Sequence, residues 1–172
     1  MTDPSTPSSR TGTTGPALEL RAVRKVYRSG DSEIVALDHA DLTVGASEIV
    51  ALLGPSGSGK TTLLSIAGGL LSATSGTVAV GGQDITGYSP TQLTDFRRTS
   101  VGFVFQSVNL VPFLTAEENL LVVDELGTRS TRLGRREARS RARSLLDELG
   151  LGHRLGNLPA QLSGGERQRV AI

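Results

Sequence analysis

A glycine-rich segment at residues 54–61 contains the residue types that bind a phosphate group. It reads Gly-Pro-Ser-Gly-Ser-Gly-Lys-Thr and matches the pattern G-x-x-x-x-G-K-[ST]. Glycines let the backbone turn its N–H groups inward around an anion, and the N-terminus of the following helix adds the positive end of its dipole. The alternative, a glycine-rich turn that only caps a helix, leaves Lys60 unexplained.

Each residue of this loop has an expected task. Lys60 should reach the β- and γ-phosphates of a nucleotide as a point charge, and the Thr61 hydroxyl should bind Mg²⁺ that bridges the same groups. The residues expected to hold the nucleotide are Gly54, Pro55, Ser56, Gly57, Ser58, Gly59, Lys60, Thr61 and Thr62.

A second candidate anion site lies near the end of the sequence, where residues 162–169 read Leu-Ser-Gly-Gly-Glu-Arg-Gln-Arg. Ser163 can act as a helix N-cap, and Gly164 and Gly165 leave backbone N–H groups uncovered at the start of the helix. Taken alone, this segment could also be an ordinary helix start.

The elements that position these motifs follow from the hydrophobic pattern. Residues 48–53 form a short apolar run, typical of a strand buried on both faces of a parallel sheet, and lead directly into the glycine-rich loop. Alternation predicts a hairpin from residues 18–26 and 34–44. Further strands are expected at residues 77–80 and 101–105, and helices at residues 60–70, 89–98, 115–126, 135–149 and from Ser163 onward.

Composition excludes several classes of function. The chain has 172 residues, a net charge of +1, six aromatic residues and no cysteine. Disulfides, thiolate catalysis and cysteine-ligated metals are therefore excluded, and the two separate histidines, His39 and His153, do not suggest a metal site. No apolar run approaches the roughly 20 residues that span a bilayer. Residues 1–16 lack the apolar segment of a signal peptide and predict a disordered tail, so a cytoplasmic protein is expected.

The phosphate loop followed by Leu-Ser-Gly-Gly closely resembles the ABC ATPase family, and the similarity extends over nearly all of residues 17–172. Residues 101–106, 109–112 and 115–120 look like the lipoprotein-release and macrolide-export branch. The resemblance implies an α/β fold, with a P-loop NTPase core, an antiparallel β subdomain and an α-helical signature subdomain, incomplete at the C-terminus. The nucleotide core and β subdomain would occupy residues 17–106, and the helical subdomain residues 107–172.

The resemblance also implies roles for single residues. Tyr27 matches the aromatic residue that stacks on adenine, and Gln106 matches a glutamine that touches Mg²⁺ and the attacking water. Lys60 and Gln106 would be the catalytic residues, with Thr61 and Gln106 at the metal. In such proteins two subunits pair head to tail, and Ser163, Gly164 and Gly165 of one close over the ATP of the other.

The partners follow from the same resemblance. ATP and Mg²⁺ are the expected cofactors, and hydrolysis drives a separate transmembrane permease subunit. The chain would lie at the inner face of the plasma membrane, in contact with it only through the permease, and without direct contact to nucleic acid. Two alternatives stay open: a soluble ABC ATPase that acts on DNA or ribosomes, and a non-functional fragment.

The sequence departs from the family pattern at its end. In the family, a strand with an acidic pair (Walker B) and later a switch histidine follow the signature helix, whereas this sequence ends at Ile172, so we expect nucleotide binding and doubtful hydrolysis. Residues 120–125, Leu-Leu-Val-Val-Asp-Glu, imitate a Walker B strand. However, Thr115 and Glu118 form a T-x-x-E capping box, which predicts a helix running through Asp124.

An arginine-rich stretch lies between residues 132 and 143 and permits two interpretations. One is a surface that binds nucleic acid or lipid headgroups. The favoured one is a solvated helix face, partly balanced by Glu137 and Glu148. Leu145, Leu146 and Leu149 are expected to face the core.

Overall fold

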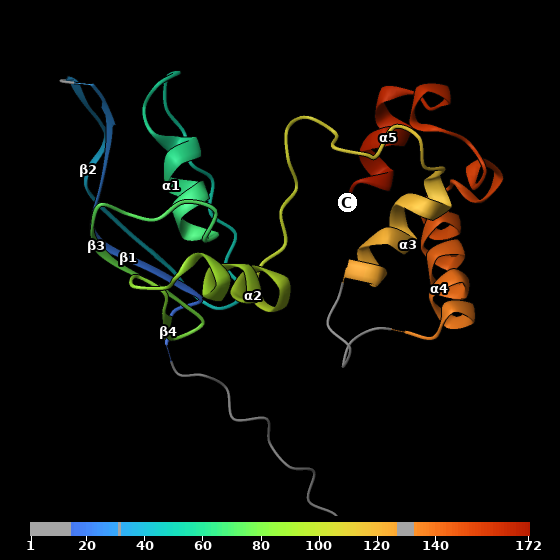
Figure 1. Ribbon diagram of the computed structural model, residues 1–172, viewed down its shortest axis with the longest axis horizontal. Helices are drawn as coiled ribbons and strands as arrows, with labels where there is room; N and C mark the ends of the chain where they lie inside the picture. Colours follow the sequence, from blue (N-terminus) through green and yellow to red (C-terminus); the bar gives the residue numbers. More distant parts are fainter. Residues whose placement is uncertain (1–14, 31, 127–132) are drawn as a thin grey trace, which may run out of the picture. The chain divides into compact units, whose positions relative to one another are not determined.

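The computed structural model describes residues 15–30, 32–126 and 133–172. The chain divides into two compact units after Val101, each described here by itself (Figure 1). The boundary expected from the sequence, after Gln106, lies slightly further along the chain. Residues 1–14 of the expected tail, and Arg132 of the arginine-rich stretch, lie outside the described residues.

The first unit is built on a four-stranded antiparallel sheet. β1 (Leu18–Ser29) and β2 (Ser32–Val44) form the expected hairpin. On its other edge β1 pairs with β3 (Ser75–Val80), and β3 pairs with β4 (Gln83–Asp84), so the strand order is β2-β1-β3-β4. The hairpin register shifts between Leu20 and Val26, where β-bulges interrupt the ladder.

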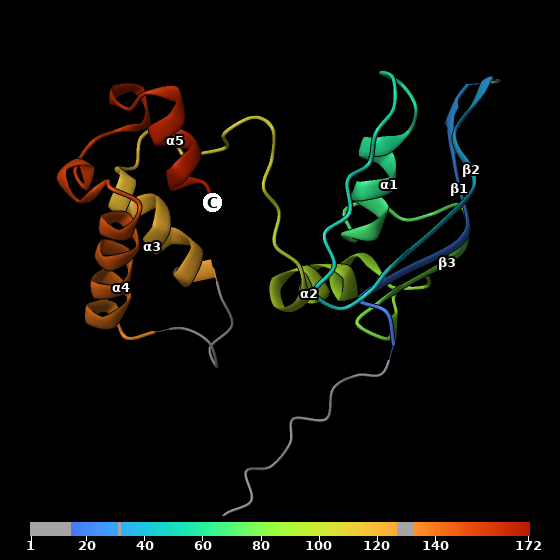
Figure 2. The ribbon, with the colours of Figure 1, turned by 180° about the vertical axis from the view of Figure 1, so that it is seen from behind.

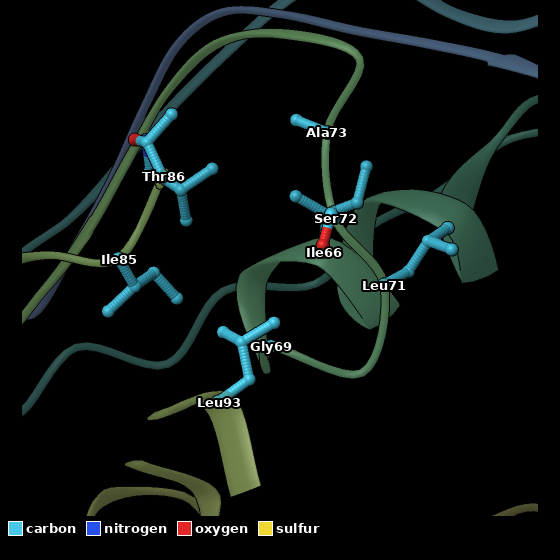
Figure 3. A pocket seen from close by; sticks show the side chains of 9 residues that line it. Ile66, Gly69, Leu71, Ser72, Ala73, Ile85, Thr86 and Leu93 are labelled. Atoms are coloured by element: carbon cyan, nitrogen blue, oxygen red, sulfur yellow. The ribbon is translucent and has the colours of Figure 1, made fainter. Parts of the chain in front are cut away.

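Two helices pack on one side of this sheet, as both ribbon views show (Figures 1 and 2). They are α1 (Lys60–Ala67) and α2 (Pro90–Ser100). The core joins apolar residues of the strands to those of the helices: Leu20, Val23, Leu37, Ile66, Val78, Ile85, Leu93 and Phe96. A small cavity, lined mainly by apolar side chains, lies between α1, the loop after it, β3 and α2 (Figure 3).

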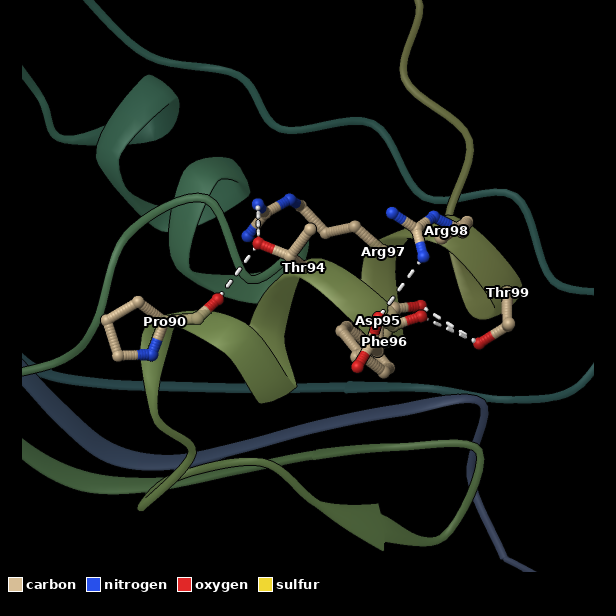
Figure 4. Close-up of polar contacts among 7 residues, drawn as sticks. All are labelled: Pro90, Thr94, Asp95, Phe96, Arg97, Arg98 and Thr99. Atoms are coloured by element: carbon tan, nitrogen blue, oxygen red, sulfur yellow. Dashed lines mark hydrogen bonds and ion pairs between the residues drawn. The ribbon is translucent and has the colours of Figure 1, made fainter. Parts of the chain in front are cut away.

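Side-chain hydrogen bonds fix the position of α2. The helix begins at Ser89-Pro90 as expected; Ser89 is its N-cap and shares a capping box with Gln92. Along the exposed face, Thr94 Oγ1 donates to the carbonyl of Pro90 and Arg98 pairs with Asp95 (Figure 4). Arg97 Nη1 donates to the carbonyl of Gly69 at 2.6 Å, which ties α2 to the turn after α1.

Two of the expected strands are not formed. Residues 48–53 and 101–105 have no regular secondary structure. Ile49 is 98% exposed and Leu53 is 91% exposed. A strand forms only where a neighbouring strand hydrogen-bonds to it, and none of the described strands pairs with either segment. Both strand predictions are therefore wrong for the described structure.

The second unit is helical. It contains α3 (Ala116–Leu126), α4 (Arg135–Glu148), the short 3₁₀ helices η1 (Gly152–Arg154) and η2 (Pro159–Gln161), and α5 (Gly164–Val170). Its core consists of Ala116, Leu146, Leu151, Leu162 and Val170. No helix among the described residues is long and apolar enough to cross a bilayer.

The start of α3 confirms the interpretation of residues 120–125. The Thr115 N–H donates to Glu118 Oε2 at 2.8 Å, and Thr115 Oγ1 accepts from the Glu118 N–H at 3.3 Å. This is the capping box read from the sequence. The helix that it starts runs to Leu126, so Asp124 and Glu125 lie on a helix and do not end a strand.

Two arginines of α4 form ion pairs with a glutamate of α3. Arg143 Nε lies 2.6 Å and Arg139 Nε lies 3.3 Å from Oε1 of Glu117, whose side chain is 11% exposed. The expected balancing by Glu137 and Glu148 is therefore replaced, for these two arginines, by a glutamate of α3. Of the three leucines expected in the core only Leu146 is buried. Leu145 remains 41% exposed because it lies beside the buried stripe of α4, and Leu149, the C-cap residue after the end of the helix, remains 37% exposed.

Candidate functional site

The glycine-rich loop leads into α1, as the motif requires. Gly57 and Gly59 have φ values of 82° and 86°, in the left-handed region. At Gly59 a Cβ atom would lie 2.7 Å from the carbonyl oxygen of Ala36 and 2.7 Å from Leu37 Cδ2, both in β2. Only glycine therefore fits where the loop turns into the helix against the hairpin.

Lys60 is the first residue of α1, and its ammonium group folds back over the loop. Its Nζ donates to the carbonyl oxygens of Gly54 at 2.9 Å and Pro55 at 2.7 Å, and to Ser58 Oγ at 3.2 Å. These partners are neutral, so the positive charge of Lys60 is not cancelled within the loop. A phosphate oxygen would be a stronger acceptor for the same three hydrogens.

The N-terminus of α1 differs from those of α2 and α5. Gly59 is its N-cap and offers no side-chain hydrogen bond, and no acidic residue lies in the first turn. Ser89 and Ser163 cap the other two helices. The N–H groups of the first turn of α1 therefore lack the side-chain acceptor that the capped helices have.

Tyr27 belongs to the same unit as the loop. It lies near the end of β1, pairs with Ile34 of β2 and is 43% exposed. The same stretch of β2 supplies Ala36 and Leu37, which back the loop at Gly59. Lys25 Nζ lies 5.3 Å from the centroid of the Tyr27 ring. One hairpin thus supports both the phosphate loop and a partly open aromatic ring.

Thr61 and Thr62 follow Lys60 in α1, with Thr61 exposed and Thr62 half-buried. Among the described residues, no group of three or more His, Cys, Asp or Glu side chains could hold a metal ion. A magnesium ion here would depend on the Thr61 hydroxyl, phosphate oxygens and water, which is the usual pattern for Mg²⁺ bound with a nucleotide.

The signature segment lies in the second unit. Leu162 is buried in the helical core, and Ser163 is the N-cap of α5. Gly164 and Gly165 are exposed. A Cβ at Gly164 would meet nothing within 4 Å, and one at Gly165 only the Arg169 side chain at 3.8 Å. The fold of the chain does not itself require these glycines.

Gln106 also belongs to the second unit and does not end a strand. It is exposed in a segment without regular structure, so the expectation of a strand end at this position is wrong. The expected site residues thus fall into two groups. Tyr27 and the phosphate loop lie in the first unit, and Gln106 and the signature lie in the second.

Two charged residues next to the signature were given no role in the sequence analysis. Glu166 accepts the Ser163 N–H at 2.7 Å, and Arg154 Nε donates to Glu166 at 3.2 Å. The hydrogen bond from the Ser163 backbone is the main reason why the pKa of Glu166 falls to about 2, with a smaller contribution from the Arg154 charge. The Ser-x-x-Glu spacing could have revealed Glu166 as half of a capping box. No local signal points to Arg154.

Known proteins resemble this chain both in sequence and in structure. A family described as "ABC transporter" matches residues 37–172. The lipoprotein-releasing system ATP-binding protein LolD of Granulibacter bethesdensis is 47% identical over 156 residues, which are 91% of this chain and 66% of LolD. A macrolide export ATP-binding/permease protein MacB of Hyphomonas neptunium is 43% identical over 159 residues, which are 92% of this chain and 24% of that protein. The chain spans about two thirds of the length of LolD.

A solved structure gives the same result for the fold. The ATP-binding cassette MJ0796, as a dimer in a post-hydrolysis state bound to ADP and Pi, aligns with a TM-score of 0.80 and 39% identity, over 90% of this chain and 66% of MJ0796. The expected fold class, a mixed α/β nucleotide-binding cassette with an antiparallel sheet and a helical unit, is confirmed.

Proposed function

The chain belongs to the ABC transporter family, and we propose that it is the ATP-binding subunit of an export or lipoprotein-release system, coupling ATP binding and hydrolysis to a separate transmembrane subunit. The observation that carries this proposal is the start of α1. There an uncapped helix N-terminus follows the glycine-rich loop, and Lys60 donates only to neutral oxygens.

Phosphate binding follows from these groups. The N–H groups of the first turn and the positive end of the α1 dipole attract the triphosphate. Lys60 exchanges its carbonyl partners for oxygens of the β- and γ-phosphates, which are charged and therefore stronger acceptors. Mg²⁺, held at Thr61, would neutralise charge between the same phosphates. Tyr27 offers its exposed ring to the adenine base.

The signature residues act from a second copy of the chain. Ser163, Gly164 and Gly165 close over the γ-phosphate bound by Lys60 of the other copy, and the two glycines present uncovered backbone N–H groups to it. Gln106 touches Mg²⁺ and the attacking water and links the site to the transmembrane subunit. The dimeric form of the similar cassette MJ0796 supports this arrangement, and the exposure of Gly164 and Gly165 is compatible with it.

The transport partner is proposed from the relatives. LolD is described as part of a lipoprotein-releasing system, and MacB as a macrolide export ATP-binding/permease protein. We place this chain on the inner face of the plasma membrane, bound to its permease. Copurification with a membrane protein supports this role, whereas copurification with nucleic acid or ribosomes would favour a soluble ABC ATPase.

Calorimetric titration of the purified protein with Mg-ATP tests the proposed site. We expect Lys60→Ala to weaken binding on the order of 100-fold, because it removes a charge-assisted contact to phosphate. Arg98→Ala is the matched control, since it removes one positive charge from the exposed face of α2 in the same unit. Equal affinity of Lys60→Ala and the control would contradict the proposal.

A further inference from the structure

A carboxylate lies beside the residues that are proposed to receive the γ-phosphate. Glu166 Oε2 accepts the Ser163 N–H at 2.7 Å, so its negative charge lies within one hydrogen bond of the signature backbone. Two negative groups this close repel each other, and the repulsion would oppose phosphate binding. The signature therefore needs a positive charge that offsets Glu166.

Arg154 provides that charge. Its Nε donates to the other carboxylate oxygen, Glu166 Oε1, at 3.2 Å. The Glu166 side chain is 15% exposed and that of Arg154 is 39% exposed, so the pair is partly shielded from water. Both oxygens of the carboxylate are thus engaged, one by Ser163 and one by Arg154.

The backbone holds Arg154 in this place. It ends η1, where its N–H donates to the carbonyl of Leu151 at 2.8 Å, and its own carbonyl accepts the Asn157 N–H at 2.9 Å. Leu151 is fully buried in the helical core. The arginine therefore approaches Glu166 from a fixed turn rather than from a free loop.

The capping box also decides what the Ser163 hydroxyl can do. Ser163 Oγ accepts the Glu166 N–H at 3.3 Å. The lowered pKa of Glu166 also has a side-chain hydrogen bond with Ser163 among its causes, so the one hydrogen of this hydroxyl is directed at the carboxylate. The donors that the capping box leaves for a phosphate are the first-turn N–H groups of Gly164 and Gly165.

We propose that Arg154 is a positioning residue of the ATP-dependent dimer: it offsets the charge of Glu166 and holds the capping box, so that the N–H groups of Gly164 and Gly165 can donate to a phosphate bound by a second copy of the chain. This inference rests on the proposed function. It adds a residue outside the two sequence motifs and a reason why an acidic residue is tolerated beside an anion site.

The competing explanation is that Arg154 only ties η1 to α5. The two explanations predict different results when the negative charge of Glu166 is removed together with Arg154. Glu166→Gln keeps an oxygen that can accept the Ser163 N–H but carries no charge. In the protein that keeps Glu166, the carboxylate stays ionised at neutral pH without Arg154, because even the ordinary pKa of a glutamate, 4.5, lies well below that pH.

Sedimentation analysis of the full chain in Mg-ATP measures the dimer dissociation constant. We expect Arg154→Ala to weaken the dimer about 10-fold, since an unscreened carboxylate then faces the phosphate. The double variant Arg154→Ala/Glu166→Gln should recover to within about 3-fold of the unaltered protein. Arg141→Ala, which removes an exposed charge from α4 in the same unit, serves as control and should have no effect.

Three outcomes overturn the inference. The first is that Arg154→Ala behaves like Arg141→Ala, and the second is that the double variant is no better than Arg154→Ala. The third outcome is that Mg-ATP drives no dimer of the unaltered protein, which contradicts the shared site as well. If Arg154→Ala does not fold, Arg154→Gln replaces it in the same set of variants. Nucleotide binding that depends on Lys60 would survive any of these results, so failure of the proposed ATP site is recognised separately.

Discussion

The phosphate loop and the signature segment both lead glycines into a helix, but the two are built differently. At α1 the N-terminus has no side-chain cap, and a neighbouring strand leaves no room for a side chain at Gly59. At α5 Ser163 and Glu166 complete a capping box, and the space around Gly164 is open. The first segment has unmet hydrogen-bonding capacity of its own. The second has its side-chain cap, and the packing of the described residues does not require its glycines.

The largest expected difference between the two segments is in stability. Gly59→Ala should lower the free energy of unfolding by about 2–4 kcal/mol. Alanine would have to adopt a left-handed backbone conformation there, and its Cβ would lie only 2.7 Å from two atoms of β2. Gly164→Ala should be neutral or raise it by up to about 1 kcal/mol, since alanine favours the helix and meets no neighbour. Urea denaturation of both variants measures these changes.

Similar losses in the two variants would contradict the comparison. So would a loss of ATP-driven dimerisation in Gly59→Ala alone, because Gly164 is expected to act at that step. Gly164→Ala should therefore keep its unfolding midpoint and weaken the dimer.

A smaller effect is expected in how the stability of the fold depends on pH. The pKa of Glu166 is lowered from 4.5 to about 2. A lowered pKa means that the carboxylate stabilises the fold in full above about pH 4.5, and that this contribution is lost as the pH falls from there toward 2. Glu166→Gln should flatten this part of the stability curve, because glutamine does not titrate. The start of α2, where Gln92 takes the same place in the capping box, has no such dependence.

Urea midpoints between pH 2 and pH 6 test this expectation, with Glu148→Gln on the exposed surface of α4 as the control for removing one carboxylate. If Glu166→Gln and Glu148→Gln follow the same pH curve, Glu166 does not contribute in the way described.

Features that depend on neighbours in sequence were predicted well. The starts of α2, α3 and α5 were expected at Ser89, Thr115 and Ser163, although the partner three residues later was recognised only for Thr115. The Thr115 box also decided correctly against a strand at residues 120–125. The loop at residues 54–61 was recognisable because its chemistry requires glycines and a lysine at fixed spacing.

Features that depend on distant neighbours were missed. The pattern suggested a buried strand at residues 48–53 and a further strand at residues 101–105, but a strand needs a hydrogen-bonded partner strand, and the described residues provide none for either segment. The approach of Arg139 and Arg143 to Glu117, and of Arg154 to Glu166, arises from helix packing. Periodicity within one segment carries no information about such pairs.

Amide hydrogen exchange with and without Mg-ATP tests the central claim most directly, namely that the uncapped start of α1 receives the phosphates. We predict that ATP slows exchange at residues 56–62, and that Lys60→Ala abolishes this protection while leaving exchange in α4 unchanged. Unchanged exchange at residues 56–62 at a saturating concentration of Mg-ATP, or equal protection in Lys60→Ala, would contradict the account.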